Sequence, residues 1–276
     1  MNKLLCAHFA RLKKDKIFLI SAALMFALGA FLPYNQYRES VKYGYVTSPD
    51  NLFFGYPQMI GVLSAVFCSL FLGKEYSDGA IRNKLAVGHS RITAYLSCLV
   101  VCITEALLVS ASYMIGSAIS GISLLGAFQS PASVLVLYLL ESILMIIALC
   151  SLFVLQSILN QYRAAAAVIN TLGIFSVIFL AVYVASRLDA PEFYDGYIFT
   201  DSLGNMTTEP IRNPQYLTGA ARTVYEFFLD FLPTGQALQF TGMNVSYPWR
   251  LPLCSLLITI VSTGAGLAAF CRKNIK

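Results

Sequence analysis

The chain has 276 residues, of which 57% are hydrophobic and 12% are charged, and its mean hydropathy is +0.68. Because soluble domains carry about 25% charged residues, this composition excludes an ordinary soluble protein and indicates a polytopic membrane protein. The formal net charge of +5 lies mostly in short segments between apolar runs, which is typical of membrane topology and argues against nucleic-acid binding.

Six apolar runs are long enough to cross a bilayer, which requires about 20 helical residues. They occupy roughly residues 17–33, 52–73, 93–120, 133–158, 164–186 and 251–271. We predict an all-α membrane protein with one six-span domain over residues 1–276. The first run could instead be a secretory signal peptide, but Pro33-Tyr34 makes a poor cleavage site, so a retained anchor is favoured.

Residues 1–16 precede the first span and are predicted to form an amphipathic interfacial helix in the headgroup region. Its two sides hold Leu4, Leu5, His8, Phe9 and Leu12 on one, and Lys3, Arg11 and Lys14 on the other. A solvated basic tail that only fixes topology is the alternative. After the first span, residues 34–51 are predicted to be a polar loop.

The segment between the second and third spans, residues 73–91, is the densest cluster of charge in the chain. Asp78 is predicted to cap a helix that runs from Gly79 through Val87, and Gly88 is a natural stop. This short capped helix favours a docking element over an ordinary topology-setting loop.

Within that segment, two features suggest a contact surface. Glu75, Asp78 and Arg82 follow one another at spacings of three and four, which would align them if the turn is continuous. Ile81 and Leu85 form an adjacent apolar pair that could fill a groove on a partner.

Two carboxylates stand inside predicted spans. Glu105 lies near the middle of the third span, and Glu141 lies in the outer half of the fourth. A charged acid there costs about 2.5–3.5 kcal/mol on insertion scales, so neither is expected to face lipid. Two interpretations stay open: a structural hydrogen bond at a helix interface, to a hydroxyl or to Asn170, or a place in a translocation path.

Small residues recur every four positions in the third span, at Ser112, Gly116 and Ser120. This spacing lets helix backbones approach closely. Packing within the chain is favoured over a dimer seam.

The stretch 187–250 is too long to be a plain connector. Within it, residues 223–232 are aromatic and apolar but too few to span a bilayer. We predict a helix that lies on or dips into the outer leaflet and is stopped by Pro233.

The distribution of basic residues predicts the orientation. If the N-terminus is cytoplasmic, thirteen of the nineteen Lys and Arg residues lie on cytoplasmic segments. Both termini and the 73–91 segment are then cytoplasmic, and residues 187–250 are external.

The sequence lacks the usual catalytic motifs. It contains no HExxH, no GxSxG and no GxxxxGK[ST] pattern, and its two histidines have no paired ligand at helical spacing. We therefore predict no catalytic residue, no metal site and no cofactor in this chain, and a protein that moves or anchors something.

The run Glu75-Tyr76, Gly79 through Leu85, Gly88 through Arg91 and Tyr95 resembles the permease subunits of type-two ABC exporters. The six-span layout, the basic N-terminal segment and the long last external loop, with the sequence LPTGQ from Leu232, are similar to that family too. The resemblance covers essentially the whole chain and is sharpest at residues 75–95.

The resemblance implies that residues 1–16 form a connecting helix and that residues 74–92 form a cytoplasmic coupling loop. Its helix would dock on a separate nucleotide-binding ATPase subunit, which binds MgATP. The expected contact residues are Glu75, Asp78, Ile81, Arg82, Lys84 and Leu85. The resemblance also implies a second permease copy or a related permease, forming a homo- or heterodimer with the substrate path near the interface.

The predicted function is export of an amphipathic peptide, lipid-like or drug-like substrate across a plasma membrane, with a bacterial source expected. Two alternatives belong to other classes. One is a non-transporting membrane anchor or immunity module, and the other is a proton-driven secondary transporter that uses Glu105 and Glu141.

Overall fold

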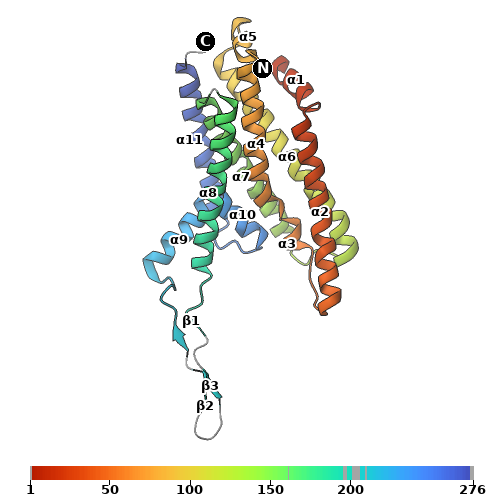
Figure 1. Cartoon of the computed structure of the whole chain (residues 1–276), viewed down its shortest axis with the longest axis vertical. Helices are drawn as coiled ribbons and strands as arrows, with labels where there is room; N and C mark the ends of the chain where they lie inside the picture. Colours follow the sequence, from red (N-terminus) through yellow and green to blue (C-terminus); the bar gives the residue numbers. More distant parts are fainter. Residues whose placement is uncertain (1, 161, 195–197, 201–205, 209, 274–276) are drawn as a thin grey trace.

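The computed structural model describes residues 2–160, 162–194, 198–200, 206–208 and 210–273. Its long helices run side by side along the long axis of the molecule (Figure 1). They are α2 (Lys16–Tyr43), α4 (Tyr56–Ser77), α6 (Arg91–Leu125), α7 (Ala132–Leu159), α8 (Arg163–Leu188) and α11 (Arg250–Arg272). All six are long and apolar enough to cross a membrane, with α4 continuing the short α3 (Asp50–Phe53). These six helices confirm the predicted helical, multi-pass architecture.

The long helices form an inner and an outer group. In the inner helices α6, α3–α4 and α7, 56%, 61% and 44% of the most apolar window is buried inside the protein, against 22% in each of the outer helices α2, α8 and α11. Each outer helix packs mainly on one inner helix: α2 on α6, α8 on α4, and α11 on α7. The apolar side chains of the outer helices therefore cover the bundle and face the surrounding lipid.

The pairing of α2 with α6 depends on glycine. A methyl group at Gly116 would collide with the carbonyl oxygen of Phe26, and one at Gly29 would collide with that of Tyr113. These close approaches show that Gly116, in the small-residue stripe of the third span, serves packing within the chain.

Helix α2 extends well beyond the predicted end of the first span. It continues through Pro33 to Tyr43 and ends at Gly44, whose φ is 72°. The expected loop at 34–51 is therefore wrong for its first ten positions and for its last two, which begin α3. Pro33 lacks only one backbone donor and is buried against Gly121, so the helix tolerates it.

Helix α1 (Asn2–Leu12) confirms the predicted N-terminal helix and its apolar side. Leu4, His8 and Leu12 are buried, and the helix packs on α6. The apolar side thus meets protein, where a headgroup location was expected. Asp15 then caps α2, because its carboxylate accepts a hydrogen bond from the backbone of Ile17 at 2.8 Å.

The long segment between α8 and α11 forms short strands and two helices. Strand β1 (Phe193–Tyr194) pairs with β4 (Ile211–Arg212), and β2 (Ile198–Thr200) pairs with β3 (Met206–Thr208), in a ribbon that projects from the bundle (Figure 1). Helix α9 (Gly219–Phe231) confirms the predicted helix. Pro233 does not only stop it: Pro233 begins α10 (Pro233–Thr241), where its missing N–H costs no hydrogen bond.

Candidate functional site

A short helix, α5 (Ala80–Ala86), lies at the end of the bundle that also carries α1 and both ends of the chain (Figure 1). Glycines with positive φ flank it, Gly79 at 64° and Gly88 at 94°. Residues other than glycine rarely adopt this backbone conformation, so the two glycines fix the turns into and out of α5. Ser90 then caps α6 by accepting a hydrogen bond from the backbone N–H of Thr93 at 3.2 Å.

The predicted cap of this helix is wrong. Helix α4 continues to Ser77, and Asp78 ends it by donating its backbone N–H to the carbonyl of Lys74 at 3.0 Å. Gly79 occupies the N-cap of α5 and makes no side-chain bond. The left-handed turn at Gly79 also means that Glu75, Asp78 and Arg82 do not follow one continuous helix.

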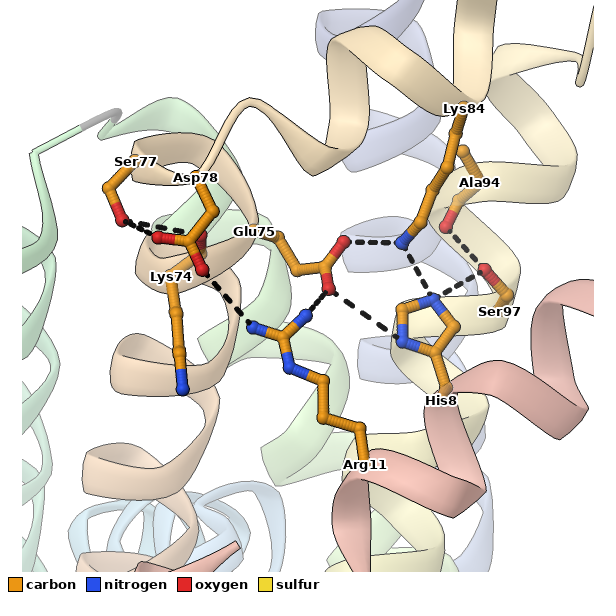
Figure 2. A network of polar contacts seen from close by, with 9 residues as sticks. All are labelled: His8, Arg11, Lys74, Glu75, Ser77, Asp78, Lys84, Ala94 and Ser97. Carbon is orange, nitrogen blue, oxygen red and sulfur yellow. Dashed lines mark hydrogen bonds and ion pairs between the residues drawn. The ribbon is translucent and has the colours of Figure 1, made fainter. Parts of the chain in front are cut away.

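Glu75, in the last turn of α4, holds three elements together (Figure 2). Its side chain is 1% exposed. Arg11 of α1 donates a hydrogen bond to one carboxylate oxygen, and Lys84 of α5 donates to the other. The second guanidinium nitrogen of Arg11 lies 3.8 Å from Asp78, and the guanidinium carbon lies 5.5 Å from the Phe71 ring centre. A buried carboxylate with a cation on each oxygen satisfies its charge and fixes α5 against α1 and α4.

His8 completes this cluster from α1. Lys84 donates to His8 Nε2 over 3.0 Å, because an ammonium can only donate, and Nδ1 lies 4.0 Å from Glu75 (Figure 2). Burial, with the adjacent Lys84, lowers the pKa of His8 from 6.5 to about 4. The imidazole is therefore neutral near pH 7 and serves as an acceptor for Lys84.

The predicted contact residues separate into buried and exposed groups. Ile81 is 4% exposed and Leu85 packs against the core, so this apolar pair faces its own chain and does not present itself to a partner's groove. Arg82 and Asn83 are exposed, and Val87 is 81% exposed. Sequence reasoning missed Asn83 and Val87. They stand two and six positions after Ile81, and this helical spacing puts them on the side opposite the buried Ile81, which is the signal that could have found them. We call Arg82 and Asn83, together with Val87 directly after the helix, the exposed face of α5.

The polar residues inside the spans do not form one site. Glu105 is 0% exposed and Glu141 is 3% exposed, and their carboxylate oxygens have no hydrogen-bond partner among the described residues. Asn170 donates instead to Ser69 and Ser157 at 2.8 and 2.9 Å and to the Phe153 carbonyl at 3.3 Å. Asn170 is therefore a structural link between α8, α7 and α4.

Sequence reasoning also missed a second link at the α5 end. Arg91, the first residue of α6, donates to the carbonyls of Phe270 and Lys273 at 2.8 and 2.6 Å. Lys273 in turn donates to the carbonyl of Leu159 at 2.9 Å, and burial lowers its pKa. Cations at helix C-termini satisfy carbonyls that lack partners, so these two residues tie the ends of α6, α7 and α11 together.

No protein-family model matches the chain, and a search of curated proteins finds no significant match. Within the ranges that the structure describes, no group of three or more His, Cys, Asp or Glu side chains could hold a metal ion.

Proposed function

We propose that the chain is the transmembrane subunit of an ATP-driven exporter of ABC type. A separate ATPase subunit would bind MgATP and act on α5, and the spans would move an amphipathic peptide, lipid-like or drug-like substrate out of the cell. The observation that carries this proposal is α5 itself. One side of this short helix is fixed to α1 and α4 through Glu75, and the other side is exposed.

This arrangement suits a part that receives a force. A contact on the exposed face of α5 would reach α4 through Glu75 and α6 through the short turn at Gly88 and Ser90. Both helices belong to the inner group of the bundle, which packs against every outer helix. Movement of α5 would therefore be transmitted to all six spans.

Orientation and partners complete the proposal. The α5 end carries most of the basic residues, so we place it in the cytoplasm of a bacterial cell, where an ATPase subunit has access to it. The sequence has no phosphate-binding GxxxxGK[ST] loop, which is why the ATP site is assigned to the partner. A second permease copy or a related permease would complete the transporter.

The proposal is tested by reversing charge on the exposed face of α5. We expect Arg82→Glu to abolish both co-purification of an ATPase subunit in mild detergent and ATP-dependent transport in vesicles. Lys14→Glu is the matched control, because Lys14 is also exposed at this end but lies between α1 and α2. Intact co-purification and transport in Arg82→Glu would refute the proposal.

One observation favours a second candidate, a proton-driven secondary transporter. Glu105 and Glu141 are both buried and lack hydrogen-bond partners in the described part of the chain. Intramembrane carboxylates of this kind occur in proton relays. Transport that needs ATP and persists when the proton gradient is dissipated would exclude this candidate, whereas transport that follows the gradient and is lost in Glu105→Gln would favour it.

A further inference from the structure

Helix α9 lies between two apolar grooves at the end of the bundle opposite α5. The α9–α11 groove has a volume of about 540 Å³ and is lined by Thr223, Val224, Phe227, Trp249, Arg250, Leu253 and Cys254. The α9–α8 groove has a volume of about 300 Å³ and is lined by Leu180, Tyr183, Val184, Tyr225 and Phe228. Both volumes fall in the range of about 300–1,000 Å³ that is usual for small-molecule sites.

The α9–α11 groove opens at the level where a span begins. Phe227, Trp249 and Leu253 are each at least half exposed. Arg250 is the first residue of α11, and the aromatic residues Tyr247 and Trp249 stand three positions and one position before it. Such aromatic residues gather at the membrane–water interface, so the groove joins the headgroup layer to the acyl chains.

Arg250 is the feature that distinguishes the two grooves. Its guanidinium lies 3.8 Å from the ring centre of Tyr247 and 5.3 Å from that of Trp249, so two aromatic faces hold it in place. It lies 3.6 Å from Asp230, which is an ion pair but too long for a hydrogen bond. Gln239 already donates to the other Asp230 oxygen at 3.0 Å.

The guanidinium therefore has donors to spare. Asp230 is its ion-pair partner among the described residues, and one carboxylate cannot occupy all five N–H donors of a guanidinium. Its side chain is 26% exposed, and no acidic residue lines the α9–α11 groove. A positioned cation at the polar end of an apolar groove matches a molecule with an anionic head and an apolar tail.

We propose that the α9–α11 groove binds a phospholipid of the bilayer, with the phosphate on Arg250 and one acyl chain along Phe227 and Leu253. Charge complementarity selects this occupant over a purely apolar one, because the α9–α8 groove offers similar apolar walls without a cation. The site is independent of the proposed export function.

The chain carries its own reporter for this site, because Trp249 is its single tryptophan. The purified chain in detergent is titrated with phosphatidylglycerol brominated on its acyl chains, and in parallel with a brominated diacylglycerol that lacks the phosphate. Quenching of Trp249 fluorescence measures occupancy. We expect the phospholipid to quench at about tenfold lower concentration, since a charge-assisted hydrogen bond contributes on this scale.

Three variants and one competitor sharpen the test. Arg250→Gln is expected to remove the preference, and the matched control Arg222→Gln to keep it, because Arg222 is paired with Glu226 at 3.1 Å and does not line the groove. The double variant Trp249→Phe with Phe228→Trp reports on the α9–α8 groove and is expected to show no preference. The comparison of the two lipids needs no variant, so misfolding of Arg250→Gln would not affect it.

Two results would overturn the proposal. One is equal quenching of the unmodified chain by both brominated lipids, which would mean that Trp249 only samples bulk acyl chains. The other is displacement of the brominated phospholipid by free glycerol phosphate as effectively as by unbrominated phospholipid, which would assign the groove to a soluble anion.

Discussion

The link between α5 and the bundle predicts a large effect of Glu75→Gln. The substitution preserves shape but leaves Lys84 without a counter-charge, and Arg11 with only the exposed Asp78 at 3.8 Å, at a position where Glu75 is 1% exposed. Breaking a buried ion pair by removing one partner costs about 3–5 kcal/mol. Because Arg11 and Lys84 are 29% and 16% exposed, both cations can turn partly to water, so we expect the lower end, about 3 kcal/mol.

This loss is local and can be measured by hydrogen exchange. The expected 3 kcal/mol corresponds to about a 100-fold faster exchange of the α5 amides, since each 1.36 kcal/mol is a factor of ten. Asp78→Asn is the matched control. Asp78 is 53% exposed and its ion pair with Arg11 is long, at 3.8 Å, and an exposed ion pair contributes about 0–1 kcal/mol to stability. Equal exchange in α5 for both variants would refute the role assigned to Glu75.

Two further predictions concern stability. His8 has a pKa of about 4 in the folded chain against 6.5 for a free imidazole, so the unfolded chain binds its proton first and the free energy of unfolding falls as the pH drops from 6.5 to 4. Denaturation across this range should show a smaller slope in His8→Gln, and an unchanged slope would contradict the assignment. Gly116→Ala should destabilise by about 1–3 kcal/mol in thermal unfolding, because its methyl group meets the backbone of Phe26. Gly173→Ala, where nothing lies within 4 Å, should be neutral, and similar losses in both would disprove the close-packing argument.

The sequence predicted the spans well, because a bilayer selects for apolar length and that property is local. It also predicted the apolar side of α1, since helical periodicity alone places Leu4, His8 and Leu12 together. It failed where two local signals compete. At Asp78 and Gly79, a favourable capping residue stands beside a glycine that ends the preceding helix, and the backbone of α4 decides the outcome.

The partners of Glu75 could not be predicted for a different reason. Arg11 lies 64 positions away in the chain, and its approach depends on how α1 packs against the bundle. The same holds for Arg91, which meets the end of α11 some 180 positions later. Contacts of this kind follow from tertiary packing, which no periodicity in a single segment encodes.

The inner and outer grouping of the helices has a consequence for how the protein is made. Because spans enter the bilayer in chain order, α2 is surrounded by lipid until α6, its main packing partner, has been synthesised. The apolar surface of α2 is mostly exposed, so this helix is compatible with lipid on all sides before α6 is present. By contrast, α6 carries the buried Glu105. When α6 enters the bilayer, α2 and α4, which both pack on α6, are already there. The last span, α11, joins a bundle whose inner helices are complete, which gives biogenesis a defined order of assembly.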